Sequence, residues 1–189
     1  MLIAKCLNDL KHEDKVDLVK TRGTEAAVHL YKNVDGMWKT LLKTHGFIGK
    51  NGVNKEKEGD LKTPIGLFEF GIAFGFENRV NTKLEYYKLN ESMYWIGDSD
   101  SKYYNQLINV CEVDGEFDNE KNEHLIKENV AYYYGIEIKY NKDNIPNKGS
   151  AIFLHCINQG ETAGCIAIPK NDMKYMIENI DKGTKILIV

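Results

Sequence analysis

Short runs of apolar and aromatic residues, separated by turn-forming residues, constrain this chain more than any other feature. Residues 16–20 (VDLVK), 26–32 (AAVHLYK) and 37–44 (MWKTLLKT) each have the length and composition of a strand. The segments between them, 21–24 (TRGT) and 33–36 (NVDG), contain residues that favour tight turns. The chain is also 11% aromatic, and aromatic rings fit a pleated surface. The pattern therefore predicts strands that pair in an antiparallel sheet.

The rest of the chain extends this prediction of a mainly β fold. Further strands are predicted at 67–74, 85–88, 92–96, 131–140, 151–155, 165–168 and 184–189. The glycine-rich stretch 46–66 predicts a long surface loop, because it lacks the Gly-Lys-Ser/Thr order of a phosphate-binding loop. The polar run 119–129 (NEKNEHLIKEN) predicts a short, mostly exposed helix.

An amphipathic helix is predicted directly after Pro169. Its N-cap is expected at Asn171 or Asp172, and Gly183 is expected to end it. The apolar stripe of this helix consists of Met173, Met176, Ile177 and Ile180.

Length and charge limit the classes of function. A chain of 189 residues suits one domain, 1–189, in which about 75–130 is a possible insertion that forms one wall of a site. The net charge is −3 and no basic patch stands out, so no nucleic-acid partner is expected. No apolar run reaches the roughly 20 residues that span a bilayer, and no signal peptide is visible. The protein is therefore expected either to work in the cytosol or to be a fragment without its export signal.

A histidine and a cysteine on consecutive predicted strands are the candidate catalytic pair. The apolar run 150–155 (SAIFLH) ends in His155, and in the run 162–168 (TAGCIAI) Cys165 directly follows Gly164. A catalytic cysteine needs a partner that lowers its pKa or removes its proton, and histidine can do so near neutral pH. The pattern predicts a thiol nucleophile and its base on neighbouring strands.

The turn before the cysteine is the candidate oxyanion site. Gly164 permits a tight turn, in which the N–H groups of Ala163, Gly164 and Cys165 could face a developing oxyanion. The hydroxyl of Thr162 could add a donor at the rim.

Other roles for these residues are open. Strand alternation places His155 on the face opposite Leu154 and Cys156, so Cys156 is not expected to be the nucleophile. Zinc binding by His155, Cys156 and Cys165 is disfavoured for the same reason, and no metal or other cofactor is expected. Cys165 could also be a small core residue, which is the commoner role of a buried cysteine.

The chain resembles the YkuD-like L,D-transpeptidases, bacterial cysteine enzymes that remodel peptidoglycan. The resemblance rests first on 152–155 (IFLH) and 162–167 (TAGCIA), and is supported by 48–53 (IGKNGV), 62–68 (KTPIGLF) and 73–75 (AFG). Matches run from about residue 16 to the C-terminus. A smaller set resembles one branch of the family and marks candidate substrate-binding residues. These are Trp95, Asp98, Ser101, Tyr104 and Asn105, together with Thr162 and Ala163.

The resemblance implies a sandwich-like or barrel-like β domain in which Cys165 is the nucleophile and His155 the general base. The thiolate would attack the carbonyl of the L-centre of diaminopimelate in a peptidoglycan tetrapeptide stem and expel D-alanine. An amine of a second stem would then resolve the thioester into a 3→3 cross-link, whereas water would make the protein an L,D-carboxypeptidase. Carbapenems acylate many members. Such a protein would act at the cell wall, outside the cytoplasmic membrane.

Three departures place the chain in a divergent branch. Ala163 stands where the commoner pattern, Ser/Thr-His-Gly-Cys, has a second histidine, and Ala167 stands where arginine or asparagine is common. The spacing from His155 to Cys165 is also shorter than usual. A backbone carbonyl or Asp98 could orient His155. A non-catalytic, peptidoglycan-binding domain on the same fold is the alternative function, and folding roles are open for the aromatic candidates.

Overall fold

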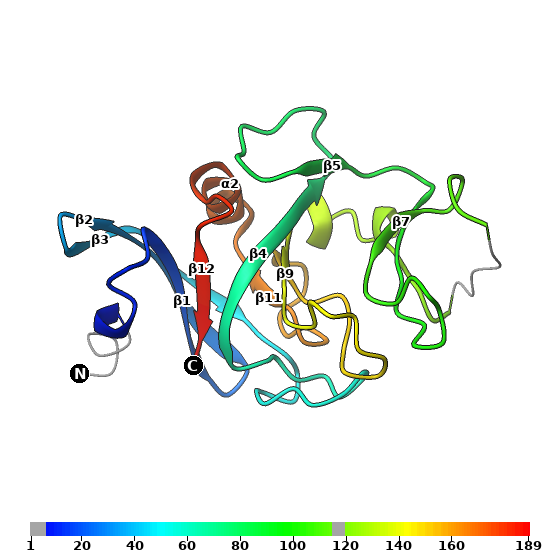
Figure 1. The fold of residues 1–189 in the computed structure, drawn as a ribbon, viewed down its shortest axis with the longest axis horizontal. Helices are drawn as coiled ribbons and strands as arrows, with labels where there is room; N and C mark the ends of the chain where they lie inside the picture. The colour runs from blue at the N-terminus through cyan, green and yellow to red at the C-terminus, as the bar shows by residue number, and fades with distance from the viewer. Residues whose placement is uncertain (1–6, 115–119) are drawn as a thin grey trace.

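The fold is dominated by β-strands, as the sequence predicts. The computed structural model describes residues 7–114 and 120–189. The main strands are β1 (Lys15–Arg22), β2 (Glu25–Val34), β3 (Met37–Phe47), β4 (Gly66–Gly75), β5 (Tyr86–Lys88), β9 (Tyr134–Ile138), β10 (Phe153–Cys156), β11 (Ile166–Ile168) and β12 (Lys185–Ile188). A smaller sheet contains β6 (Met93–Trp95), β7 (Leu107–Asn109) and β8 (Glu123–His124). The helical elements include η1 (Leu125–Lys127), η2 (Ala131–Tyr133) and α2 (Lys170–Asn179) (Figure 1).

The main sheet closes on itself. Its nine strands follow the order β12-β1-β2-β3-β11-β10-β9-β4-β5, and β12 also pairs with β4. Val16 of β1 is opposite Lys185 in parallel register, and Lys185 is opposite Glu69 of β4 in antiparallel register. The result is a barrel-like ring to which β5 is added alongside β4. As predicted, β1, β2 and β3 pair antiparallel through two tight turns.

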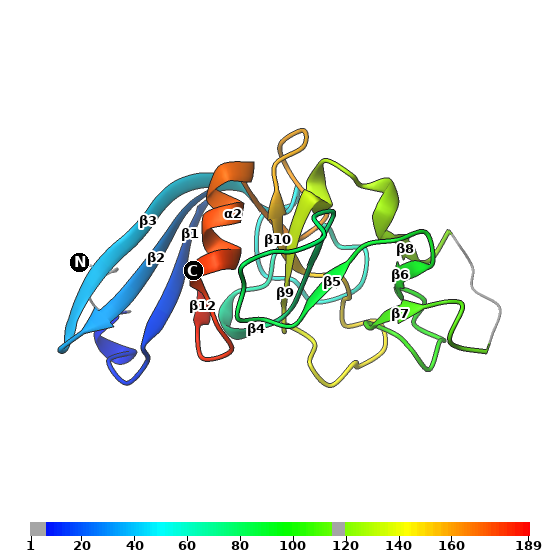
Figure 2. The same ribbon diagram turned by 90° about the horizontal axis from the view of Figure 1, so that it is seen from above.

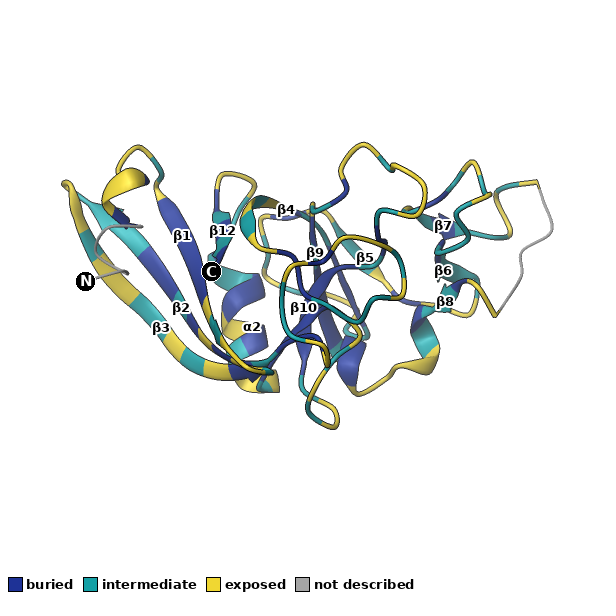
Figure 3. Cartoon of the chain, turned by 90° about the horizontal axis from the view of Figure 1, so that it is seen from below, coloured by how far each residue is buried: buried dark blue, intermediate teal, exposed yellow. Residues whose placement is uncertain are grey.

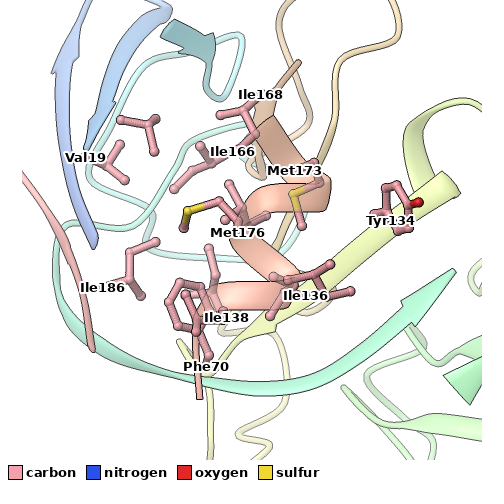
Figure 4. Packing of buried hydrophobic residues seen from close by; sticks show 14 of the residues in the cluster. Val19, Phe70, Tyr134, Ile136, Ile138, Ile166, Ile168, Met173, Met176 and Ile186 are labelled. Carbon is pink, nitrogen blue, oxygen red and sulfur yellow. The ribbon is translucent and has the colours of Figure 1, made fainter. Parts of the chain in front are cut away.

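The main hydrophobic core lies between this sheet and α2. The helix lies against the sheet and contacts β9 and β10 (Figure 2). Met173, Met176 and Ile177 are fully buried and meet apolar side chains of several strands, among them Ile136 and Ile186 (Figure 4). Burying each of these side chains contributes about 1.5–3 kcal/mol, so the predicted apolar stripe is the face that holds α2 on the sheet.

The ends of α2 differ from the prediction. The N-cap is Pro169, in extended conformation and without a side-chain cap hydrogen bond. Asp172 lies in the first turn but accepts a hydrogen bond from the hydroxyl of Thr44 on β3, at 2.6 Å. The helix ends at Asn179, and Ile180 is its C-cap, so Gly183 belongs to the following turn. Proline fixes a φ that suits helix entry, which explains why the helix begins earlier than expected.

The predicted helix at 119–129 is wrong over its described part, because residues 120–129 contain β8 and η1 instead (residue 119 lies outside the described residues). Trp95 of β6 is opposite Glu123 of β8, and the ring of His124 stacks on Tyr94 at 4.1 Å between centroids. Leu125 is fully buried in a second hydrophobic cluster. These contacts override a polar sequence that favours a helix.

The connection 46–66 is also not the plain surface loop that was predicted. It does link β3 to β4, but Ile48 and Thr63 within it are fully buried. Burial differs between the other elements. All of β10 and much of α2 are buried, whereas most residues of β3 are exposed or partly exposed (Figure 3). No helix among the described residues is long and apolar enough to cross a bilayer.

Candidate functional site

Two neighbouring parallel strands position the histidine and the cysteine. Leu154 of β10 is opposite Ile166 of β11, and both belong to the main core under α2. Phe153 and Cys165, one residue earlier on each chain segment, belong to the second hydrophobic cluster. Because side chains alternate along strands, His155 lies on this second side as well. The prediction that the pair lies on neighbouring strands is confirmed, and the structure adds that the two side chains share a face.

The thiol of Cys165 is held by two backbone groups. Its Sγ donates to the carbonyl of Ala151 at 3.2 Å and accepts from the N–H of Phe153 at 3.3 Å. Since a carbonyl only accepts, the sulfur carries its proton in this state. Burial, together with the nearby carboxyl of Glu123, raises the pKa of Cys165 to about 12. The resting group is a neutral thiol.

The imidazole of His155 is also neutral. Its Nδ1 lies 2.8 Å from the carbonyl oxygen of Cys156, so Nδ1 carries the hydrogen and Nε2 has a free lone pair. Burial lowers the pKa of His155 to about 4. A backbone carbonyl therefore orients the ring. Asp98, the other candidate, accepts instead from the N–H of Asp100 and lies 3.5 Å from Lys121.

The turn before Cys165 depends on a glycine. Gly164 has φ +143°, and a Cβ there would lie 2.8 Å from the carbonyl oxygen of Lys62. The Gly164 N–H donates to the hydroxyl of Thr162 at 3.1 Å, and that hydroxyl donates to the carbonyl of Cys165 at 2.7 Å. In this state the Gly164 N–H and the Thr162 hydroxyl both donate within the turn, and their roles toward a substrate stay predictions. The N–H groups of Ala163 and Cys165 remain the candidate oxyanion donors.

A buried hydroxyl of the 46–66 connection supports this turn. Thr63 donates to the carbonyl of Gly164 at 2.8 Å and accepts from the N–H of Gly49 at 2.8 Å. Gly49 forms a bridge to Thr162, and a Cβ at Gly49 would lie 2.5 Å from the carbonyl of Leu61. Sequence reasoning missed this role, although Thr63 and Gly49 lie in two of the motifs that carry the family resemblance.

His155 and Cys165 line one cavity of about 690 Å³. Of the other predicted residues, Trp95, Thr162 and Ala163 line it too. Its charged lining residues are Lys55, Glu58, Glu120, Lys121, Glu123, Glu128 and Glu161. Four of these charged residues come from 75–130, the segment that was predicted to form one wall of the site. That this segment is an insertion stays a prediction.

Two of the remaining candidates support the wall of the cavity. The Asn105 side chain accepts from the N–H of Ala151 and from the indole N–H of Trp95, each at 3.1 Å. The hydroxyl of Tyr104 accepts from the N–H of Gly149 at 3.0 Å. Both side chains hold the segment in which the Ala151 carbonyl accepts the hydrogen bond from the Cys165 thiol. Asn105 and Ala151 each have a positive φ, a backbone conformation that is strained for the alanine.

The other two candidates, Asp98 and Ser101, are not among the residues that line the cavity. The Ser101 hydroxyl accepts from the N–H of Tyr103 at 3.2 Å, which is a turn contact. Cys156 lies in the main core, on the face opposite Cys165, and burial raises its pKa to about 11. No group of three or more His, Cys, Asp or Glu side chains within 7–114 and 120–189 is arranged to hold a metal ion.

Comparison with known proteins identifies the family. Residues 24–188 match YkuD, the L,D-transpeptidase catalytic domain. The chain belongs to the YkuD family. A comparison with curated proteins gave no significant match. The mainly β, barrel-like fold with few helices is that of a YkuD domain, as the sequence resemblance implied.

Solved structures similar to this YkuD domain include three bacterial proteins. The helical cell shape determining protein Pgp2 from Campylobacter jejuni has a TM-score of 0.49 and 16% identity, covering 93% of this chain and 47% of its own. Bd1075 from Bdellovibrio bacteriovorus has a TM-score of 0.48 and 16% identity, covering 94% and 48%. L,D-transpeptidase 1 from Mycobacterium tuberculosis has a TM-score of 0.44 and 11% identity, covering 94% and 62%. The chain spans about half the length of the first two.

Proposed function

We propose that this YkuD domain is a cysteine-dependent L,D-transpeptidase that acts on peptidoglycan tetrapeptide stems through a thioester on Cys165. The supporting observation is the geometry of the pair: Cys165 and His155 lie on one face of two paired strands, and both open into the same cavity. A thiol nucleophile with a histidine base would suit the transpeptidase activity of the family to which residues 24–188 belong. The domain would then work outside the cytoplasmic membrane, where its substrate lies.

The acylation step begins with a neutral thiol on Cys165 and a neutral imidazole on His155. Nε2 of His155 takes the thiol proton as Sγ of Cys165 attacks the carbonyl carbon of the L-centre, so that a C–S bond forms. The N–H groups of Cys165 and Ala163 stabilise the oxyanion. His155 then gives its proton to the nitrogen of D-alanine as the C–N bond breaks. No preformed thiolate is required, which agrees with the raised pKa of Cys165 and the lowered pKa of His155.

Intact-protein mass after incubation with a carbapenem tests the nucleophile. The wild-type protein should gain one covalent adduct, and Cys165→Ala should gain none. Cys156→Ala is the matched control, because that thiol is buried on the opposite face and should not affect labelling. His155→Ala should slow labelling by about 10²-fold or more, the usual contribution of a general base. Release of D-alanine from a tetrapeptide stem then tests the natural reaction.

A non-catalytic peptidoglycan-binding domain is the second candidate. The observation that favours it is the resting thiol, which is neutral and hydrogen-bonded to the Ala151 carbonyl rather than to a base. This function predicts that the folded protein binds muropeptides, gains no adduct and releases no D-alanine. A full adduct on a folded Cys165→Ala variant would refute the role of Cys165 as the acylated nucleophile.

A further inference from the structure

A carboxyl group and a phenol share the cavity with the catalytic pair. Glu123 extends from β8 into the lining, and one of its carboxyl oxygens accepts a hydrogen bond from the hydroxyl of Tyr132. The Tyr132 ring packs perpendicular to the ring of His155, at 5.5 Å between centroids. Tyr132 also contacts Phe153, the residue whose N–H donates to Cys165. One chain of contacts thus joins the Glu123 carboxyl to both reacting side chains.

The acylation step makes no use of this carboxyl. Sulfur loses a proton to His155, and His155 returns it to the leaving D-alanine, so acylation is balanced without another acid or base. Glu123 is only partly shielded from the cavity by its neighbours, and Trp95 opposite it on β6 holds its backbone in place. A partly buried carboxyl at this position is available for the second half of the reaction.

Proton balance in that second half depends on the acceptor. A water molecule that attacks the thioester gives up one proton, which His155 passes to the leaving sulfur. A primary amine, by contrast, arrives as an ammonium ion, since an amine like that of lysine has a pKa near 10.4 and only roughly one molecule in 2,500 is neutral at pH 7. It must lose two protons to become an amide nitrogen, so it needs a second proton acceptor.

We propose that Glu123 is a further catalytic residue that binds the ammonium group of an amine acceptor and removes its first proton. This inference rests on the proposed transpeptidase function. The Glu123 carboxylate takes one proton from R–NH₃⁺, and the neutral amine attacks the thioester carbonyl. The C–N bond forms, the C–S bond breaks, and the second proton passes through His155 to Sγ of Cys165. The protonated Glu123 then returns its proton to solvent.

The charge around Glu123 supports this role. The pKa of Glu123 is raised to about 7, mainly by burial and to a smaller extent by Glu128 and Glu58, while the hydrogen bond from Tyr132 acts in the opposite direction. The carboxyl is therefore poised to gain or lose a proton near neutral pH. The groups that line the cavity with it are Glu58, Glu128, Tyr132, His155, Cys165 and Lys55, together with the other charged lining residues named above. Carboxylates outnumber lysines in this set, which favours a cationic acceptor.

The test compares two fates of one acyl-enzyme. A tetrapeptide stem serves as donor, with or without a tripeptide stem that carries a free amine, and mass spectrometry counts cross-linked and hydrolysed products. For Glu123→Gln we expect the ratio of cross-linked to hydrolysed product to fall about 10²-fold, the usual scale for a lost general base; this ratio does not depend on how fast the acyl-enzyme forms. This loss should shrink about tenfold per pH unit as the amine itself becomes neutral.

Two further variants shift the pH dependence in opposite directions. In the wild type, amine transfer should rise through about pH 7 as Glu123 ionises. Tyr132→Phe removes a hydrogen bond that lowers the pKa of Glu123, so the rise should move to higher pH. Glu128→Gln removes a charge that raises this pKa, so the rise should move to lower pH. A merely structural role would not give opposite shifts.

Several results would overturn the inference. Equal losses of acylation, hydrolysis and amine transfer in Glu123→Gln would show that Glu123 has only a structural role. Unchanged amine transfer would show that Glu123 takes no part in the reaction. Should Glu123→Gln fail to fold, identical pH profiles for Tyr132→Phe and Glu128→Gln would still refute it. A wild-type protein that never forms the acyl-enzyme removes the proposed function itself, and it is recognised separately by the absence of D-alanine release.

Discussion

Asp17 on β1 should destabilise the fold at neutral pH, and its replacement by asparagine should stabilise it. The side chain is fully buried, and neither of its carboxyl oxygens has a hydrogen-bond partner among the described residues. Its backbone lies between Leu30 of β2 and Ile186 of β12, in the middle of the sheet. An isolated carboxylate is costly in such a place, and burial raises the pKa of Asp17 to about 8.

The magnitude follows from the two pKa values. The carboxyl has a pKa of 3.8 when unshielded and about 8 in the fold, so the folded state binds the proton more tightly. Stability from this group is complete below pH 3.8 and falls by about 1.4 kcal/mol per pH unit up to about pH 8. At pH 7 the loss is about 4 kcal/mol. An asparagine amide at this position would lack hydrogen-bond partners just as the protonated carboxyl does, but it does not titrate. Asp17→Asn should therefore raise the free energy of unfolding by about 4 kcal/mol at pH 7.

Urea denaturation from pH 4 to pH 9 measures this effect. The difference in unfolding free energy between Asp17→Asn and wild type should be near zero at pH 4 and grow toward pH 8. Asp181→Asn is the matched control, because the Asp181 carboxylate lies 2.5 Å from the amine of Lys15 and its pKa is lowered. That control should lose stability at pH 7. The reasoning would be refuted if Asp17→Asn were no more stable than wild type at pH 8.

Three further predictions concern the site. Gly164→Ala should destabilise the fold by about 1–3 kcal/mol and slow acylation, because its Cβ would meet the Lys62 carbonyl at a φ of +143°; urea unfolding and adduct kinetics measure both effects. Alkylation of Cys165 by iodoacetamide should rise tenfold per pH unit through pH 9, because burial raises its pKa to about 12, and a plateau near pH 8.5 would contradict this. Asn105→Ala should lower the free energy of unfolding by about 1–3 kcal/mol and slow acylation, because the Ala151 N–H loses its acceptor. Asn105→Asp keeps an acceptor oxygen, so it should slow adduct formation less.

The placement of the candidate pair, His155 and Cys165, could largely be predicted because it follows from strand alternation on two consecutive strands. Alternation on β10 puts His155 and Cys156 on opposite faces, and the glycine before Cys165 indicates a turn there. Within the predicted strand 131–140 the same rule puts Ile136 and Ile138 on one face, and both lie in the main core. The closure of the sheet into a ring could not be predicted, since it requires a partner for β12 that no local pattern specifies.

The wall of the cavity was harder to predict because it departs from local propensity. Tyr132 was predicted within one strand, 131–140, where it would share the face of Tyr134. The turn η2 instead places Tyr132 in the second cluster, while Tyr134 lies in the main core. Glu123 lay in a predicted exposed helix, so its place beside the thiol was missed. Thr63 acts across a long separation in sequence, and only the folded chain brings it to Gly164.

The double pairing of β12 has a consequence for how the chain folds during synthesis. β1 and β4 both depend on β12 for a neighbour, yet β12 leaves the ribosome long after them. Until then each presents an unpaired strand edge, and such edges invite pairing with other chains. The ring can close only after residues 185–188 have emerged, so a nascent chain stalled before them should be the form that most needs protection from aggregation.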